Sequence, residues 1–137
     1  MKRGAFTLME MILVVVILGL LASLVLPQFI GRGKEAKVAV AKAQVDSIKV
    51  ALSSFELDLD RFPTTSEGLA ALMEKPASLA ADSNWRPYLD EKKVPTDPWG
   101  NEYIYRRPGV ENPETYDLFS PGPDGRTDTD DDIGNTR

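Results

Sequence analysis

The stretch that decides the fold is FTLMEMILVVVILGLLASLVL, which runs from Phe6 to Leu26. Of its 21 residues, the ones with polar side chains are Thr7, Glu10 and Ser23. As an α-helix with a rise of ~1.5 Å per residue, the stretch would be about 31 Å long, which is enough to cross a bilayer. A carboxylate inside such a span costs roughly 2.5–3.5 kcal/mol at mid-bilayer, so Glu10 either lies near the headgroups or awaits a positive partner from another chain.

The basic start of the chain, Lys2 and Arg3, leaves three interpretations of this apolar run open. A cleaved secretory signal would end in an Ala-x-Ala-like pattern, but the residues that flank Ala22 and Ser23 are leucines. A lipoprotein signal needs a cysteine, and the chain has none. We therefore favour a retained single-span anchor, which the positive-inside rule orients with residues 1–5 in the cytoplasm.

Composition limits what the rest of the chain can do. The 137 residues allow one small domain, and 42% hydrophobic with 27% charged residues is close to globular averages. The absence of Cys and His excludes disulfides and thiol catalysis, and it removes the commonest general base. A net charge of −5 argues against a nucleic-acid-binding domain.

Beyond the span, apolar residues recur every three or four positions, which is the period of an amphipathic helix. They are Val38, Ala41, Val45, Ile48, Leu52, Phe55 and Leu59. The pattern predicts that the helix continues to about Asp60, with a break or bend near Pro27 and residues 31–33. Because one face of this helix is apolar, the remaining residues must supply a layer that covers it.

The C-terminal part combines short periodic segments with turn signals. Thr65 or Ser66 is placed to cap a short helix over residues 67–73. Alternation predicts strands over 102–106 and 116–120. The expected fold class is α+β, with one long helix packed on a small antiparallel sheet and long loops.

Aromatic residues in this part are expected to pack in the core rather than to form a sugar-binding platform. They are Trp85, Trp99, Tyr103 and Tyr105. The segment 97–101, Asp-Pro-Trp-Gly-Asn, is expected to be a structural turn in which Gly100 supplies an unusual backbone angle.

An acidic cluster lies close to the C-terminus. The nine residues 124–132 contain five aspartates, which repel one another unless the loop is extended or binds a cation. Hard oxygen ligands suit Ca²⁺, although the spacing is not that of an EF-hand. A solvated acidic tail is the alternative, but Ile133 and Gly134 favour an ordered end.

The N-terminus resembles the type IV pilin-like signal: a basic leader, a small residue, then Phe6-Thr7-Leu8-Met9-Glu10 and a long apolar run. The resemblance implies that a prepilin peptidase cuts between Ala5 and Phe6 and that the new amine of Phe6 is methylated. It implies that Glu10 pairs with that amine on a neighbouring subunit, and that the stretch from Gly19 to Pro27 is partly melted in filaments. The family usually has Gly before the cut, so a cut after Gly4 is the alternative.

Further matches follow in order along the C-terminal part and resemble the major pseudopilins of type II secretion (general secretion protein G). They are the segments 62–65, 67–69, 87–89, 97–101, 116–118 and 122–125. The resemblance implies a type IV pilin-like fold with one calcium ion in the C-terminal loop. Its implied ligands are Asp124, Asp130, Asp132 and the Pro121 carbonyl, with Asp128 and Asp131 in reserve.

The resulting organisation is a cleaved leader (1–5), a transmembrane and filament-core helix (6–27), a periplasmic continuation (28–60) and a periplasmic globular domain (61–137). The resemblance implies an inner-membrane protein that polymerises into the periplasmic pseudopilus and drives export of folded proteins. Its implied partners are prepilin peptidase, minor pseudopilins, the inner-membrane assembly platform and the secretin channel. A type IV pilus subunit is the alternative, whereas an enzyme is not expected because the chain offers little to build an active site from.

Overall fold

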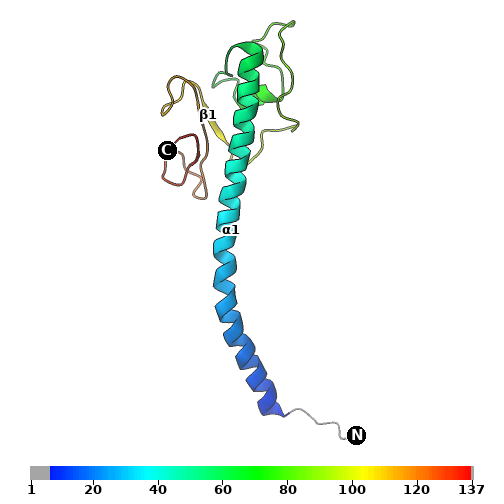
Figure 1. Cartoon of the computed structure of the whole chain (residues 1–137), viewed down its shortest axis with the longest axis vertical. Helices are drawn as coiled ribbons and strands as arrows, with labels where there is room; N and C mark the ends of the chain where they lie inside the picture. The colour runs from blue at the N-terminus through cyan, green and yellow to red at the C-terminus, as the bar shows by residue number, and fades with distance from the viewer. Residues whose placement is uncertain (1–6, 137) are drawn as a thin grey trace, which may run out of the picture. The chain divides into compact units, whose positions relative to one another are not determined.

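A computed structural model describes residues 7–136, and it describes residues 24–32 of the helix by their backbone only. The predicted cleavage and methylation positions, Ala5 and Phe6, lie outside the described residues, as does the side chain of Pro27. The chain divides into two compact units, Met1–Ala36 and Lys37–Arg137. The elements are helix α1 (Leu8–Leu59), 3-10 helix η1 (Leu69–Leu72), and strands β1 (Ile104–Arg106), β2 (Asp117–Ser120) and β3 (Ile133–Gly134) (Figure 1).

Helix α1 is one uninterrupted helix of 52 residues. Of the two alternatives predicted near Pro27 and residues 31–33, a break or a bend, the break does not occur, because α1 is continuous through both places. A long helix can pass through one proline by bending. The predicted end of the helix is confirmed. Asp60 has a left-handed φ of 56° and donates its N–H to the Glu56 carbonyl at 2.7 Å, which closes the last turn.

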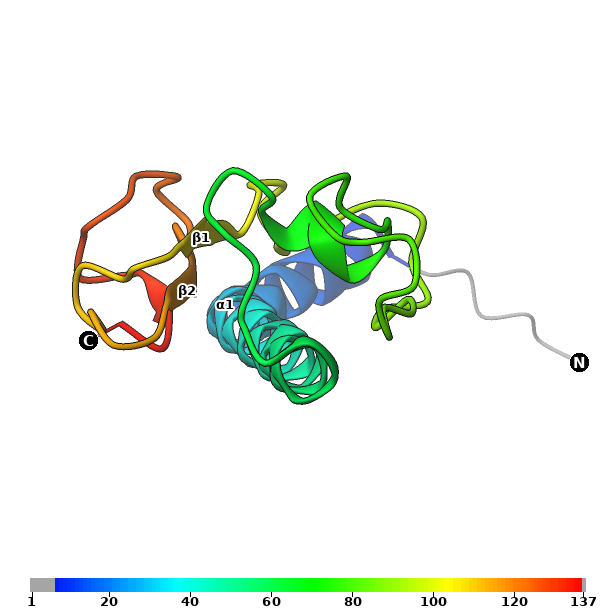
Figure 2. The same cartoon turned by 90° about the horizontal axis from the view of Figure 1, so that it is seen from above.

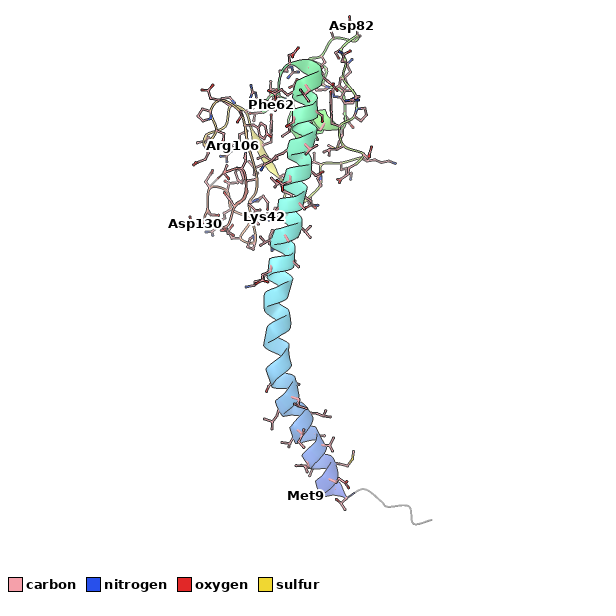
Figure 3. All side chains as sticks on the ribbon, viewed as in Figure 1. Met9, Lys42, Phe62, Asp82, Arg106 and Asp130 are labelled. Carbon is pink, nitrogen blue, oxygen red and sulfur yellow. The ribbon has the colours of Figure 1, made fainter. Side chains whose placement is uncertain are left out.

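The first part of α1 is apolar on all sides and exposed in the isolated chain. The exposed fraction of its large side chains runs from 46% at Val14 to 80% at Leu8. Figure 3 shows the side chains around Met9 pointing away from the helix in several directions. Within the residues that the structure describes, no helix contains a run that is both long and apolar enough to cross a membrane.

The core of the second unit is built on the predicted helical stripe. Its helical members are Ala41, Val45, Ile48, Leu52 and Phe55, all buried. They pack against residues from the loops and strands: Phe62, Leu69, Leu72, Tyr103, Tyr105, Tyr116 and Leu118. Each large side chain buried in this way contributes roughly 1.5–3 kcal/mol. The prediction that the rest of the chain covers the stripe is confirmed.

The sheet is small, antiparallel and ordered β1-β2-β3. Tyr105 of β1 lies opposite Leu118 of β2, and Phe119 of β2 lies opposite Gly134 of β3. All four residues of the central strand β2 are buried. The two strands predicted from alternation are confirmed, although β1 begins two residues later than predicted, and the ordered end expected at Ile133 is strand β3.

The short helix predicted over residues 67–73 is present as the 3-10 helix η1. Its predicted cap, Thr65 or Ser66, is wrong: Gly68, with a φ of 59°, stands at the N-cap position without a side-chain hydrogen bond. The Thr65 hydroxyl is engaged elsewhere, because it donates to the Arg107 carbonyl at 2.8 Å. This bond ties the loop after α1 to the end of β1.

Candidate functional site

The predicted turn at residues 97–101 is confirmed, and the buried carboxylate of Asp97 organises it. One oxygen of Asp97 accepts the backbone N–H groups of Trp99 at 3.0 Å and Asn101 at 2.8 Å. Its other oxygen accepts the Ser120 hydroxyl at 2.5 Å. Gly100 has the expected positive φ of 94°, which other residues adopt at a cost. The turn is therefore fixed to the end of β2.

The turn at residues 97–101 is also bonded to the start of the C-terminal loop. The Asn101 side-chain amide donates to the Gly122 carbonyl at 2.9 Å. Gly122 has a φ of 67°, and a Cβ at this position would overlap the backbone carbonyl oxygen of Asp131. The start of the loop at residue 122 and its return at residue 131 thus touch each other, which only glycine permits.

The carboxylates of the loop are used mainly to hold its own backbone. Asp124 accepts the N–H of Arg126 at 2.8 Å, and the N–H of Asp124 donates to Asp131 at 3.3 Å. The other oxygen of Asp131 accepts the Thr129 hydroxyl at 2.7 Å. This hydrogen bond from Thr129 lowers the pKa of the Asp131 carboxyl below its ordinary value.

Asp132 differs from Asp124, Asp128 and Asp131 because one of its buried carboxylate oxygens has no hydrogen-bond partner among the described residues. Its Oδ2 accepts the N–H groups of Asp128 at 2.8 Å and Thr129 at 3.3 Å. Its Oδ1 is buried and finds no hydrogen-bond partner among the described residues. Burial raises the pKa of the Asp132 carboxyl. An unpaired buried carboxylate oxygen costs free energy that a cation or a proton would recover.

Asp128, a reserve ligand, is engaged with the sheet instead. It forms an ion pair with Arg106 of β1 at 3.0 Å, and this bond lowers the pKa of the Asp128 carboxyl. The Arg106 guanidinium also lies over the Phe119 ring, 5.4 Å from its centroid. Through this ion pair, Asp128 connects the tip of the loop to strand β1 of the sheet.

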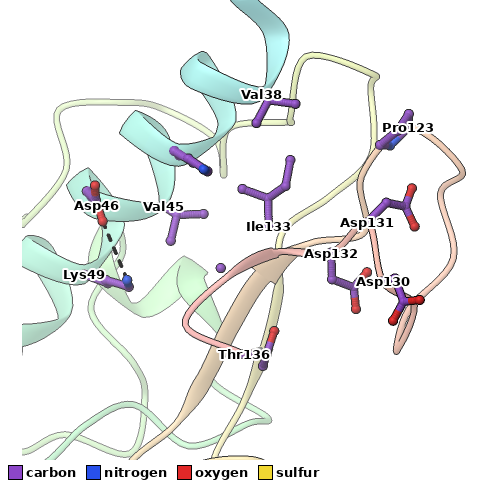
Figure 4. A pocket seen from close by; sticks show the side chains of 12 residues that line it. Val38, Val45, Asp46, Lys49, Pro123, Asp130, Asp131, Asp132, Ile133 and Thr136 are labelled. Carbon is purple, nitrogen blue, oxygen red and sulfur yellow. Dashed lines mark ion pairs between the residues drawn. The ribbon is translucent and has the colours of Figure 1, made fainter. Parts of the chain in front are cut away.

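A groove of about 580 Å³ separates this loop from the second-unit part of α1. Its apolar lining includes Val38, Val45 and Ile133. Figure 4 shows Ile133 pointing toward the helix, whereas Asp130 and Asp132 point away from it. Charged side chains line the same groove: Lys42, Asp46 and Lys49 from the helix, and Asp130, Asp131 and Asp132 from the loop.

Among the residues that the structure describes, no three acidic side chains converge in a way that could hold a metal ion. The donor set nevertheless fits a hard cation chemically, because it consists of carboxylate and carbonyl oxygens. The left-over Asp132 oxygen is the observation in favour of this fit. Asp124 and Asp131 adjoin each other across the loop, because the Asp124 N–H donates to the Asp131 carboxylate.

Asn135, close to the end of the described residues, holds the C-terminal loop against the sheet. Asn135 completes the ladder beyond β3: its side-chain oxygen accepts the Leu118 N–H at 2.6 Å, and its side-chain amide donates to the Tyr116 carbonyl at 2.7 Å. Its own N–H donates to the Leu118 carbonyl at 3.0 Å. One side chain and its backbone therefore extend the sheet by the equivalent of another strand residue.

The N-terminal candidate site consists of one carboxylate on an apolar helix. Glu10 lies in the first turn of α1, and its N–H donates to the Thr7 hydroxyl at 3.2 Å, so Thr7 caps the helix. The Glu10 side chain is exposed, as are the apolar side chains that follow it. Gly19, the predicted start of the melting segment, is helical, and nothing lies within 4 Å of the position that a Cβ would take.

Comparison with known proteins shows the family to which this chain belongs. Residues 28–136 match the sequence profile of the family described as type II secretion system (T2SS), protein G. The chain belongs to this family.

Proteins named type II secretion system core protein G from Pseudomonas aeruginosa and Escherichia coli K12 are 46% and 43% identical to it. Each alignment covers 98% of this chain, with 95% of the Pseudomonas protein and 91% of the Escherichia protein. The crystal structure of the major pseudopilin from the type 2 secretion system of enterohaemorrhagic Escherichia coli has a TM-score of 0.62. It is 36% identical in sequence and covers 77% of this chain and 91% of that one.

Membership of the protein G family confirms several predictions at once. The α+β fold of the pilin-like type is confirmed, and this chain is a pseudopilin of type II secretion, an envelope-associated system. Nothing in these comparisons favours the alternative of a type IV pilus subunit.

The structure confirms the predicted packing role of Tyr103 and Tyr105. Both are buried, and their hydroxyls donate to Gln44 at 2.6 Å and to the Pro63 carbonyl at 2.7 Å.

One polar residue that organises the protein G fold was missed by the sequence analysis. Asp117 is 1% exposed and accepts the backbone N–H groups of Val110 (2.6 Å), Glu111 (3.0 Å) and Asn112 (3.0 Å). The Asn112 side chain adds a fourth bond at 2.8 Å. The signal was present, because an Asp between apolar strand residues in Tyr-Asp-Leu-Phe must be buried together with its partners.

Proposed function

We propose that copies of this chain polymerise through their apolar stems into the pseudopilus of a type II secretion system. The observation that carries the proposal is the exposed stem of α1. The apolar side chains from Leu8 to Leu21 are exposed in the isolated chain, and packing against other copies would keep them out of water once a subunit leaves the membrane. In this scheme each subunit adds mass to a filament that moves folded proteins outward.

Glu10 gives this assembly its register. It is the single ionisable side chain between residues 7 and 23, so its counter-ion must come from outside the stem. Cleavage after Ala5 would create an amine at Phe6, and that amine on a neighbouring copy is a cation of the right size. A buried carboxylate without a partner costs several kcal/mol. A wrongly placed copy would leave that cost unrelieved, which favours one position of each new subunit.

Before assembly, the stem would hold the subunit in the inner membrane as a single span, with the C-terminal part in the periplasm. Lys2 and Arg3 support this orientation. The partners would be prepilin peptidase, the inner-membrane assembly platform, minor pseudopilins and the secretin channel. We propose no catalytic role, since the chain has neither Cys nor His and offers little from which to build an active site.

The test is Glu10→Lys in the full chain, expressed together with its secretion system. Mass analysis of the N-terminus should find methylated Phe6 in both the unaltered chain and the variant. Filaments sheared from cells should form with the unaltered chain and disappear with Glu10→Lys. Glu35→Lys, at another exposed glutamate of α1, is the matched control and should assemble. Normal filaments from the Glu10 variant would refute the pairing.

We also propose that the C-terminal loop binds one calcium ion, which would hold the loop closed in place of a disulfide. Asp124, Asp130, Asp132 and the Pro121 carbonyl are the proposed ligands, and the contact between Asp124 and Asp131 makes Asp131 a further candidate. The left-over Asp132 oxygen supports a cation at this place. An ion that binds the folded state alone stabilises it by mass action, about 2.7 kcal/mol at a hundredfold excess over its Kd.

The calcium proposal is tested by thermal unfolding in calcium and in chelator. The unaltered chain should melt at a lower temperature in chelator, and Asp124→Ala should remove the difference. Asp82→Ala, an exposed aspartate in another loop, should keep the calcium response. Identical melting curves for the unaltered chain in calcium and in chelator would overturn the proposal.

A further inference from the structure

The C-terminal loop contains a reactive dipeptide that has no part in the proposed assembly. Asp124-Gly125 is the one Asp-Gly pair of the sequence, and no Asn-Gly pair occurs in it. The carboxyl carbon of an aspartate can be attacked by the backbone nitrogen of the next residue, which closes a succinimide ring. Glycine favours this reaction because it has no side chain to shield its nitrogen and its backbone reaches conformations that are closed to other residues. The sequence therefore marks Asp124 as a reactive position.

The fold holds the two reacting groups close together. The Asp124 Oδ1 accepts the N–H of Arg126 at 2.8 Å, two residues further along the chain. A carboxylate that bonds in this way folds back over the peptide between the two residues, so its carboxyl carbon lies beside the Gly125 nitrogen. Ring closure then needs little further movement, which is the usual advantage of reacting groups that are held in position.

The Gly125 nitrogen is open to reaction. Its N–H donates to the Gly122 carbonyl at 3.4 Å, which is longer than a usual hydrogen bond. Residues 123–128 are all exposed, so water can reach the ring and open it. Figure 2 shows this loop, in orange and red, as a wide turn at the edge of the second unit. By contrast, the Asp46-Ser47 pair lies within helix α1, where the helical hydrogen bonds hold the backbone nitrogens.

The loop also requires the glycine that makes this position reactive. Gly125 has a φ of 68°, and a Cβ here would lie 3.3 Å from the Asn101 Oδ1, which is tighter than an ordinary contact. The amide of the same Asn101 side chain donates to the Gly122 carbonyl. A side chain at position 125 would therefore strain the backbone and press on the residue that fixes the start of the loop. The reactive pair follows from the geometry of the loop.

We propose that Asp124 is a site of spontaneous modification, at which the folded loop isomerises aspartate to isoaspartate. The Gly125 nitrogen forms a bond to the carboxyl carbon of protonated Asp124, and the amide proton leaves with the carboxyl OH as water. A second water molecule then adds to the main-chain carbonyl carbon of the ring. The bond from this carbon to the Gly125 nitrogen breaks, and the nitrogen takes up the proton. The product has the same mass, but its main chain runs through the former side chain.

Isomerisation breaks the hydrogen bonds that shape the loop. The main chain gains one carbon atom after Asp124, and the new carboxylate is attached directly to the Cα, from which it cannot reach the Arg126 N–H. Both sides of the site are held in place, by the bond from the Asp124 N–H to Asp131 and by the ion pair between Asp128 and Arg106. The extra atom therefore strains these contacts, and the isomerised chain has a less stable C-terminal loop.

The test is storage of the full chain in detergent at neutral pH, with chelator so that no metal ion holds the Asp124 carboxylate. Proteolytic peptides are separated by chromatography, and electron-transfer fragmentation distinguishes isoaspartate from aspartate. Isoaspartate at residue 124 should accumulate at least about tenfold faster than at two reference pairs. These are Asp82-Ser83, in an exposed loop, and Asp46-Ser47, in α1. Equal rates at the three pairs would overturn the proposal.

Two further measurements separate the effect of the fold from that of the dipeptide. The rate at residue 124 should be at least as high in the folded chain as in the chain unfolded in urea. A folded rate about tenfold below the unfolded rate would overturn the proposal, because the fold would then keep the reacting groups apart.

Asp124→Asn should close the same ring faster, with ammonia as the leaving group, and should lose its amide on storage. Asp124→Glu, which would need a larger ring, is the matched control and should stay unmodified. An Asp124→Asn variant that kept its amide would also overturn the proposal. The reaction does not depend on polymerisation, so its failure would leave the proposed function standing.

Discussion

The Asp117 carboxylate allows a quantitative test of what holds the C-terminal unit together. In Asp117→Ala the N–H groups of residues 110–112 lose their acceptor, and so does the Asn112 side chain. A buried donor left without a partner costs ~1–3 kcal/mol. Val110 and Glu111 are exposed residues and their bonds to Asp117 are only partly buried, so their share lies near the low end of this range. We expect a loss of about 3–5 kcal/mol, a large part of the ~5–15 kcal/mol that stabilises a domain.

The assay is urea unfolding of the full chain in detergent, followed by the fluorescence of Trp85 and Trp99. Asp117→Asn keeps one acceptor oxygen and should lose roughly half as much free energy of unfolding as Asp117→Ala. In melting experiments the alanine variant should unfold at least ~12 °C lower, at ~4 °C or more per kcal/mol. A loss below about 1 kcal/mol for Asp117→Ala would refute the reasoning, because it would mean that water replaces the carboxylate without cost.

The pH dependence of the free energy of unfolding tests whether the negative charge of Asp117, and not only the shape of its side chain, stabilises the fold. Burial alone would raise the pKa of this carboxyl, but the N–H donors of residues 110–112 outweigh burial and hold the pKa below its ordinary value. The folded state therefore favours the charged form. Its stabilising contribution is complete above the pKa of the unfolded chain and is lost as the pH falls through the lower folded pKa. The difference between the unaltered chain and Asp117→Ala should be constant from pH 5 to 8 and shrink below about pH 4.

Two further predictions concern the loop after α1 and the last strand. Glu67 accepts two bonds from Arg61, at 2.7 and 2.9 Å, and this pairing lowers the pKa of Glu67 to about 2. Glu67→Gln should therefore cost about 1–2 kcal/mol at neutral pH, and urea titrations should show that difference fading as the pH falls from about 4 toward 2. Gly134→Ala would push a Cβ into the Leu118 carbonyl oxygen and the Phe119 Cβ, so it should separate β3 from β2. Hydrogen exchange at the Leu118 amide would report this separation, and unchanged protection there would contradict the assignment of a close contact.

The parts of the fold that follow from a simple period were predictable from the sequence. The 3–4 spacing from Val38 to Leu59 fixed both the helix and its buried face, because burial of one helical face requires that spacing. The turn at residues 97–101 was equally accessible, since Asp and Gly at these positions act through local backbone chemistry. In each case the cause lies within one element.

The features that were missed depend on hydrogen bonds to residues in another segment of the chain, from 5 to 42 positions away. Strand β3 is two residues long, which is too short for alternation to be visible, and the side chain of Asn135 completes it. The Asp117 bonds join β2 to the loop before it, and the choice of Gly68 rather than Thr65 at the start of η1 follows from a bond to residue 107. Sequence patterns cannot weigh such competition between local and distant partners, because each hydroxyl or carboxylate could bond to several groups.

The two units differ in how far their own residues cover apolar side chains and pair buried charged ones. This difference bears on assembly. In the second unit, buried acids such as Asp97 and Asp117 have full sets of donors, and the apolar stripe of α1 is covered by the unit's own residues. The stem of α1 instead exposes apolar side chains that no described residue of this chain covers. A stem of this kind has a place for other copies of the same chain. If Glu10→Lys left the yield of filaments unchanged, apolar packing of the stem alone would have to hold the polymer together.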